Sequence, residues 1–317
     1  MQENKQIVAE YTSYPRQFAP YKWYKPLLVI ILATVFSYIV GTIIALVSYY
    51  VARGAGADIS GLNNVSYDNL NIYSTVGALV TLAPIAVMLP GVFVGNRIVN
   101  SRPFSSISSS RGGFDFKVLL KCFVPAIILV GIPLIIYTLA TCPRTDAIKF
   151  TVPGYILCTI LAPLQCVSEE YTMRGLLMQT FGSWIRVPVI AVLLQAVAFM
   201  LLHPYNLTGM ISVGLTGVIL GVIACVTHGL EASCALHIVN NMASFYFLGF
   251  GFQSTGSEVS IADMVISLIV SVLYLAFIIY ADKKLGWFDH IIKDDVSEFN
   301  AKYEMRKARK ASNQESQ

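Results

Sequence analysis

Long runs of apolar residues alternate with short polar segments along the whole chain. Because an α-helix rises about 1.5 Å per residue, roughly 20 apolar residues are needed to cross about 30 Å of hydrocarbon. Runs that reach or approach this length cover residues 27–51, 73–94, 118–141, 152–173, 188–202, 207–226, 232–250 and 264–280. The pattern predicts an all-α fold, a polytopic membrane bundle of about eight transmembrane helices.

The composition supports a lipid environment and excludes an ordinary soluble domain. The chain has 317 residues, of which 56% are hydrophobic and only 13% are charged, and its mean hydropathy is +0.65. So few charges cannot keep that much apolar surface in water. Most of the cysteines lie in apolar runs without metal-ligand spacing, so we expect free, buried thiols.

Lys and Arg are unevenly distributed between the connections of the predicted spans. All but three of the 22 lie before the first span, in the second and fourth connecting regions, or after the last span. The exceptions are Arg53, Arg144 and Lys149. With an even number of spans, this bias predicts a multi-pass protein of the cell membrane with both termini in the cytoplasm. Clusters of this kind do not fit a nucleic-acid surface, so no nucleic-acid partner is expected.

The predicted organisation has three parts. Residues 1–26 form a cytoplasmic N-terminal segment, and residues 27–281 form the transmembrane domain. Residues 282–317 form a charged cytoplasmic tail, which we interpret as a solvated helix or a disordered end. The serine-rich residues 98–116 are predicted to be a flexible cytoplasmic loop. No cleaved signal peptide is expected, because about 25 mostly polar residues precede an apolar run that is too long for one.

Ionisable residues interrupt the apolar runs at a few positions between residues 150 and 250. An ionisable side chain inside a span costs a few kcal/mol, so each is a candidate for function. The fourth run ends in Glu169, Glu170 and Arg174, the fifth in Phe199 and His203, and the seventh contains His237, Asn240 and Asn241.

Helical spacing assigns first roles to these residues. Glu170 and Arg174 are four residues apart and share a helix face, whereas Glu169 points about 140° away from Arg174. Arg174 therefore neutralises Glu170, and Glu169 remains free to act as a base. Four-residue spacing also pairs Phe199 with His203 and His237 with Asn241, for which Asn240 is a possible substitute.

The depths of these groups in the membrane agree only in part. In an antiparallel hairpin, Glu169 and His203 differ in depth by about 5 Å, whereas His237 lies nominally about 10 Å closer to the cytoplasm. Structural explanations also exist: an ion pair at a helix end, an interfacial histidine at position 203, and a hydrogen bond between helices at position 237. Gly214, Gly217 and Gly221 form a stripe typical of close helix packing.

Three motifs in this region resemble the CPBP family of intramembrane proteases, named for CAAX-processing and bacteriocin-processing members and also called Abi. The family motifs EExxxR, FxxxH and HxxxN match Glu169-Glu170-xxx-Arg174, Phe199-xxx-His203 and His237-xxx-Asn241, in the family order. The resemblance covers roughly residues 150 to 250, and each motif alone is weak. The ordered set within a multi-span chain is specific.

The resemblance implies a glutamate-dependent intramembrane endopeptidase that uses water as its nucleophile. Glu169 would activate water with help from His203, and His237 and Asn241 would stabilise the oxyanion. Glu170, Arg174 and Phe199 would support the site. No cofactor is expected, although two glutamates and two histidines are also a possible Zn²⁺ ligand set.

The expected partners are the lipid bilayer and a peptide or membrane-protein substrate, in a bacterial cell. The alternative function is a non-catalytic membrane protein that binds peptides, confers immunity to a bacteriocin or acts as a regulatory scaffold. A secondary transporter is a third candidate, disfavoured because the sequence has no internal repeat. Retention of every motif position favours the enzyme.

Overall fold

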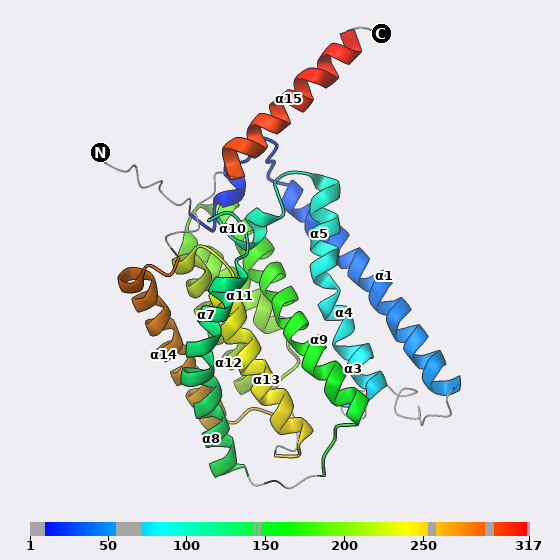
Figure 1. Ribbon diagram of the computed structural model, residues 1–317, viewed down its shortest axis with the longest axis vertical. Helices are drawn as coiled ribbons and strands as arrows, with labels where there is room; N and C mark the ends of the chain where they lie inside the picture. The colour runs from blue at the N-terminus through cyan, green and yellow to red at the C-terminus, as the bar shows by residue number, and fades with distance from the viewer. Residues whose placement is uncertain are drawn as a thin grey trace.

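The computed structural model describes residues 10–54, 71–142, 144, 147–252, 258–288 and 295–315, which form a bundle of helices (Figure 1). The α-helices are α1 (Lys25–Gly54), α3 (Thr75–Thr81), α4 (Ala83–Ala86), α5 (Met88–Val99), α6 (Ser105–Ser108), α7 (Phe116–Ala126), α8 (Ile132–Thr141), α9 (Val152–Glu170), α10 (Gln179–Ile185), α11 (Pro188–Leu201), α12 (Leu207–Thr227), α13 (Glu231–Gly249), α14 (Ile261–Leu285) and α15 (Asp295–Glu315). A 3₁₀ turn, η1 (Tyr14–Gln17), and two π-helical segments, η2 (Ile127–Gly131) and η3 (Tyr171–Met178), complete the set. The predicted all-α fold is confirmed.

Helices lie over all eight predicted runs, but six helical segments among the described residues are long and apolar enough to cross a membrane. They are Lys25–Gly54, Thr75–Val99, Phe116–Thr141, Val152–Ile185, Leu207–Thr227 and Ile261–Leu285. The other two runs differ for identifiable reasons. α11 is apolar but has only 14 residues, and α13 has 19 residues but carries Glu231, His237 and two asparagines.

Lipid-facing surface is evident on the outer helices. In α1 the side chains of Ile31, Ile39 and Ile43 are 56%, 52% and 54% exposed. A row of exposed isoleucines four and eight residues apart on a 30-residue helix is stable in lipid and not in water. The chain is therefore embedded in a membrane.

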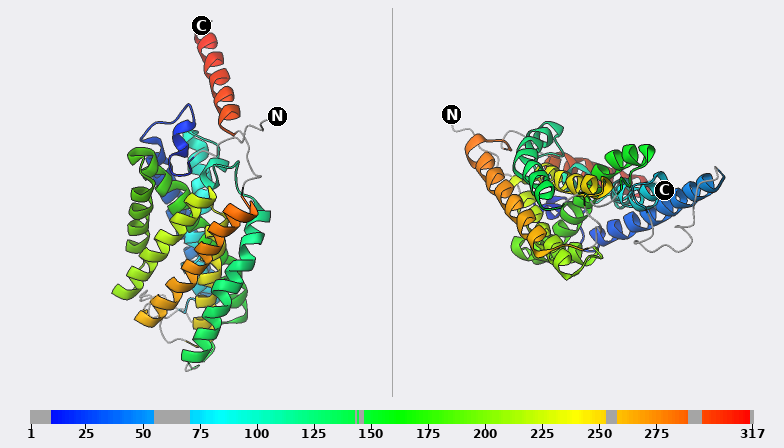
Figure 2. Two further views of the ribbon diagram at one scale, coloured as in Figure 1. Left: turned by 90° about the vertical axis from the view of Figure 1, so that its left-hand side faces the viewer. Right: turned by 90° about the horizontal axis from the view of Figure 1, so that it is seen from below.

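The helices are arranged so that α9 and α13 pack against each other, and the end of α9 that carries Glu169 and Glu170 is buried inside the bundle. α9 packs against α3, α4 and α13, and α13 also packs against α7. Seen from below in Figure 2, α1 and α14 lie at opposite edges of the bundle. The first eight residues of α13, Glu231–Ile238, are all buried, so the polar groups of this helix face protein and not lipid.

The glycine stripe on α12 lies where this helix meets α11, as predicted. A Cβ atom on Gly217 would lie 3.3 Å from Cα of Ala196, and one on Gly221 would lie 2.9 Å from Nε2 of Gln195. Because these positions lack side chains, the two helices approach closely and leave the Gly217 carbonyl accessible to neighbouring donors.

The serine-rich loop is folded and buried, so the prediction of a flexible segment at residues 98–116 is wrong. Residues 106–111 of this loop are all buried. The amide of Leu230 donates to the carbonyl of Ser108, and Arg111 forms a 2.8 Å ion pair with Glu231, the first residue of α13. Hydropathy indicated that the loop is polar, but it could not indicate that Leu230 and Glu231, far away in the sequence, bond to it.

The two terminal segments meet at the same end of the bundle. Phe18 packs edge-on against Phe299 of α15, with ring centroids 5.5 Å apart, and Asn300 bonds to the backbone of Gln17 and Ala19. Beyond this contact α15 projects away from the other helices, in red in Figure 1. Of the two interpretations of the tail, the solvated helix is confirmed for residues 295–315.

Candidate active site

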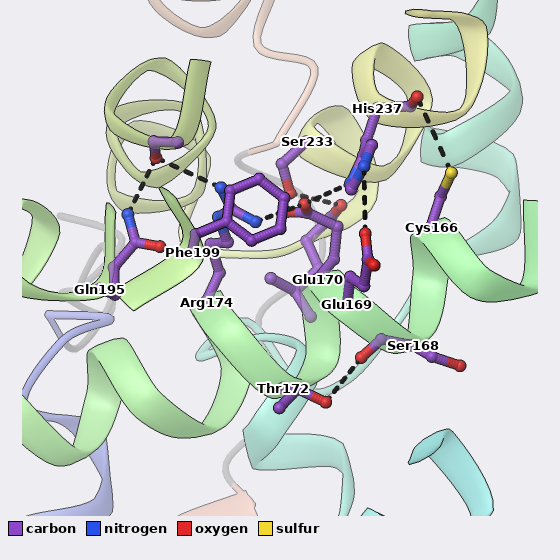
Figure 3. Close-up of polar contacts among 12 residues, drawn as sticks. Cys166, Ser168, Glu169, Glu170, Thr172, Arg174, Gln195, Phe199, Ser233 and His237 are labelled. Atoms are coloured by element: carbon purple, nitrogen blue, oxygen red, sulfur yellow. Dashed lines mark hydrogen bonds and ion pairs between the residues drawn. The ribbon is translucent and has the colours of Figure 1, made fainter. Parts of the chain in front are cut away.

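The predicted site residues come from four elements that meet inside the bundle (Figure 3). Glu169 and Glu170 end α9, and the chain continues without a break into the π-helical segment η3, which carries Arg174. Phe199 lies near the end of α11, and His237 lies in the second turn of α13. π-Helical segments are rare and occur often at functional sites.

Glu170 and Arg174 form a buried ion pair, which confirms the prediction from their spacing. Nη1 of Arg174 donates to Oε1 of Glu170 at 2.9 Å, and both side chains are fully buried. Nη2 donates to the carbonyl oxygen of Gly217 at 3.3 Å, and the guanidinium lies 4.5 Å from the ring centroid of Phe199. These contacts replace the water that Arg174 would bind outside the membrane.

His237 lies between the two consecutive glutamates. Its Nδ1 is 2.8 Å from Oε1 of Glu170, and its Nε2 is 3.4 Å from Oε2 of Glu169. An ionised carboxylate only accepts hydrogen bonds, so Nδ1 of His237 carries a proton and donates a hydrogen bond to Glu170. In the neutral ring Nε2 is then an acceptor, and the amide Nδ2 of Asn241 lies 3.3 Å from it. The nominal depth difference of about 10 Å is absent because α13 packs directly against α9.

Glu169 has one satisfied and one unsatisfied carboxylate oxygen. Nε2 of Gln165, one helical turn earlier, donates to Oε1 at 3.2 Å. Oε2 accepts no hydrogen bond from any residue that the structure describes. A buried carboxylate oxygen without a donor is costly, and such atoms in native structures usually indicate a function or a bound water.

His203 is joined to the site through Phe199. Its Nδ1 lies 2.8 Å from the carbonyl oxygen of Phe199, and the two rings meet edge-on at 4.6 Å. The other edge of Phe199 faces His237, with centroids 5.9 Å apart. Phe199 therefore lies between the two imidazoles, as its position in the second motif allowed. Because a carbonyl only accepts, Nδ1 of His203 donates, and its Nε2 is left as an acceptor.

Three further residues near the site were not singled out from the sequence. Gln165 contacts Glu169, and Gln195 donates to the same Gly217 carbonyl as Arg174, at 2.8 Å. Tyr205 packs on His203 at 5.7 Å between ring centroids, and burial, followed by the charge of Glu169, raises the pKa of its hydroxyl. The signal for the two glutamines was present, because each is a polar residue within an apolar run.

The arrangement is suited to proton transfer next to a balanced ion pair. Arg174 neutralises Glu170. The partners of Glu169 are instead the amide of Gln165 and the imidazole of His237. Within the described residues, no group of three or more His, Cys, Asp or Glu is arranged to hold a metal ion. The side chains that meet at this site carry a carboxylate, an imidazole and an asparagine amide at Glu169, His237 and Asn241.

Comparison with known proteins finds a family match and a curated relative. Residues 149–243 match the family described as type II CAAX prenyl endopeptidase Rce1-like. A curated relative, the uncharacterized protein YyaK of Bacillus subtilis (strain 168), is 25% identical over 173 residues, or 50% of this chain and 57% of that protein. The matched part thus spans little more than half of the relative's length. No solved structure matches the chain.

The matched family segment contains all three motifs and all the predicted site residues, so the resemblance to the CAAX-processing membrane proteases is confirmed for residues 149–243.

Proposed function

We propose that this protein is an intramembrane endopeptidase that hydrolyses a peptide bond of a membrane-associated or peptide substrate. The observation that carries the proposal is the unsatisfied Oε2 of Glu169, which lies 3.4 Å from Nε2 of His237. A water molecule beside this pair has a carboxylate to accept its proton, and the family match of residues 149–243 supports a protease.

The reaction proceeds by general-base catalysis at Glu169. As the water oxygen attacks the carbonyl carbon of the substrate, its proton passes to Oε2 of Glu169. His203 assists through Nε2, which is free to accept because Nδ1 donates to Phe199. The proton held on Glu169 then moves to the leaving nitrogen as the C–N bond breaks, which gives a carboxylic acid and an amine.

In the proposed reaction, Asn241 and His237 stabilise the tetrahedral intermediate. The amide Nδ2 of Asn241 donates, and it lies beside Nε2 of His237 at 3.3 Å. Donation from Nε2 of His237 requires the imidazolium, whose positive charge then lies between the Glu170 carboxylate at Nδ1 and the oxyanion at Nε2. Gln165 holds Glu169 in position through its other oxygen.

The test is a comparison of Glu169→Gln with Glu170→Gln. Both changes replace one carboxylate by an amide of the same shape, at adjacent positions. Glu169→Gln should abolish cleavage and leave the melting temperature close to that of wild type, because the Gln165 contact to Oε1 is retained. Glu170→Gln should instead lower the melting temperature, because Arg174 loses its partner.

Cleavage is measured by mass spectrometry of new peptide termini in membranes from cells that produce each variant, with Glu304→Gln on the exposed part of α15 as the control. Termini that appear with wild type and Glu304→Gln and disappear with Glu169→Gln support the proposal. If Glu169→Gln produced the same termini as wild type, the protein would not be a Glu169-dependent peptidase. If a deletion strain that produces Glu169→Gln instead recovered the wild-type phenotype, a peptide-binding or scaffold function would replace the enzymatic one.

A further inference from the structure

A second pocket lies away from the active site, at the end of the bundle where the termini meet. It encloses about 490 Å³ between the last turns of α5, the chain that follows α5, and α15. Its lining includes four cationic side chains, from Arg97, Arg102, Lys302 and Arg306, and the aromatic rings of Phe93 and Phe299 among others. None of these residues belongs to the three motifs.

The charges in this pocket have one sign. No Asp or Glu is among the described residues that line it. Lys302 pairs with Glu298 one turn earlier on α15, outside the lining. Across the described part of the chain, Arg97 and Arg306 have no ion pair and no hydrogen bond from their side chains. Lys302 and Arg306 are also four residues apart on one helix face, where like charges repel.

Of the four cationic side chains, that of Arg102 is held in place by hydrogen bonds. Its guanidinium is held by the side-chain oxygen of Gln179 and by the carbonyl of Gly175 at 3.4 Å, and only 5% of the residue is exposed. Burial lowers the pKa of Arg102 to about 10, which leaves the group charged at neutral pH. A buried cation with only neutral partners creates a positive potential that an anion would relieve.

The wall contributed by α15 is also held in place. Phe18 packs against Phe299, and Asn300 bonds to Gln17 and Ala19, so the first turns of α15 are attached to the N-terminal segment. The pocket therefore lies between α5 with the loop that follows it and a part of α15 that the N-terminal segment holds in place. Nothing in the proposed hydrolysis uses this arrangement.

The position of the pocket along α5 adds an apolar side to it. Phe93 is 50% exposed and lies one helical turn, about 6 Å, before Arg97 within the candidate span Thr75–Val99. Phe93 and Arg97 therefore place an apolar and a cationic side chain of the lining next to each other near the end of the span. Phosphate groups of lipids lie at this level of a bilayer, and basic pockets at the ends of spans are suited to their headgroups.

We propose that this pocket binds a phosphate-bearing anion between α5 and α15. The guanidinium groups of Arg97, Arg102 and Arg306 match phosphate oxygens, since each presents several N–H donors in a planar fork. A lipid headgroup and a free phosphate share this chemistry, and Phe93 offers an apolar contact that only a lipid would use.

The test measures the melting temperature of the full-length protein with three probes. The probes are vesicles of phosphatidylcholine alone, vesicles of phosphatidylcholine with phosphatidylglycerol, and inorganic phosphate added to protein in detergent. The variant is the double substitution Arg97→Gln and Arg306→Gln. The matched control is Arg309→Gln and Lys310→Gln, which removes the same charge from exposed positions of α15 outside the pocket.

Phosphatidylglycerol should raise the melting temperature of wild type and of the control, and the pocket variant should bind it about tenfold more weakly. A shift in melting temperature with phosphatidylglycerol alone identifies a lipid headgroup as the ligand. A shift with inorganic phosphate as well identifies the free anion, and either result supports the site. If neither anion shifted the melting temperature of wild type, or if the control lost as much of the shift as the pocket variant, the proposal would be overturned. The readout is independent of proteolysis.

Discussion

Nδ1 of His237 lies 2.8 Å from Oε1 of Glu170, and this same oxygen accepts a hydrogen bond from Arg174 at 2.9 Å. One carboxylate oxygen thereby fixes the orientation of an imidazole and the position of a guanidinium. Because Nδ1 is committed to Glu170, Nε2 is the atom that faces Glu169 and Asn241. The structural ion pair and the proposed reaction are therefore coupled through one atom.

Breaking the buried ion pair should destabilise the protein strongly. Glu170→Gln or Arg174→Met alone should cost about 3–5 kcal/mol, because each leaves a buried charge without its partner. The double variant should recover part of the loss. Thermal unfolding in detergent measures the three variants, and additive losses in the double variant would contradict the pairing.

The two histidines should differ in their effect on turnover. His237→Gln should lower kcat by about 10²–10³, because it removes an oxyanion donor and the group that faces Glu169. His203→Gln should lower kcat less, by about tenfold, because its contacts in the structure are with Phe199 and Tyr205. Kinetics on a peptide identified from the cleaved termini measures both. A greater loss for His203→Gln than for His237→Gln would reverse these roles.

Gly217 should not tolerate a side chain. A Cβ atom there lies 3.3 Å from Cα of Ala196 and 3.4 Å from the ring of Phe199, so Gly217→Val should cost about 1–3 kcal/mol and displace Phe199 from Arg174. Gly54→Val at the end of α1 is the control, because no atom of the residues that the structure describes lies within 4 Å of a Cβ at that position. Equal melting temperatures for the two variants would argue against close packing of α11 on α12.

Chelators should leave the activity unchanged. The proposed reaction uses a carboxylate and two imidazoles, so incubation with a strong chelator should alter neither cleavage nor the melting temperature. Metal analysis of the purified protein accompanies the assay. Stoichiometric zinc that is lost together with activity, and restored with it, would require a metal-assisted reaction at these residues instead.

Limited trypsin digestion should distinguish the buried loop from the exposed tail. Arg102 and Arg111 are 5% and 1% exposed, whereas Arg306 and Arg309 lie on the exposed part of α15. Cleavage needs local unfolding, which costs least where few contacts hold a helix. The tail should be removed first and the loop cut last. Early cleavage after Arg111 would contradict the packing of this loop against α13.

The helix positions were predictable because lipid imposes a simple requirement on the chain. A run of apolar residues in a bilayer satisfies its backbone only as a helix, so hydropathy located α1, α12 and α14 to within a few residues. The same signal also marked α11 and α13, which are not among the six candidate spans. α11 has only 14 residues, and α13 carries Glu231, His237 and two asparagines, so an apolar run alone did not reveal the length or polarity of the helix that forms there.

The spacing of polar residues predicted contacts within one helix well, and it predicted contacts between helices less well. Four-residue spacing predicted the Glu170–Arg174 pair and the contact of His237 with Asn241. It did not reveal that His237 would contact Glu169 directly, because the depth of α13 relative to α9 is set by packing. The burial of the serine-rich loop was missed for the same reason.

Sequence by itself determined that this protein is embedded in lipid, that it is helical, and which few polar side chains are candidates for its chemistry, since these properties depend on local composition and helical periodicity. Only the tertiary structure decided which of those side chains meet: His237 with both glutamates, Phe199 between the two imidazoles, and Arg111 of a polar loop with Glu231. Contacts between distant segments depend on how whole helices pack, and no local pattern records that packing.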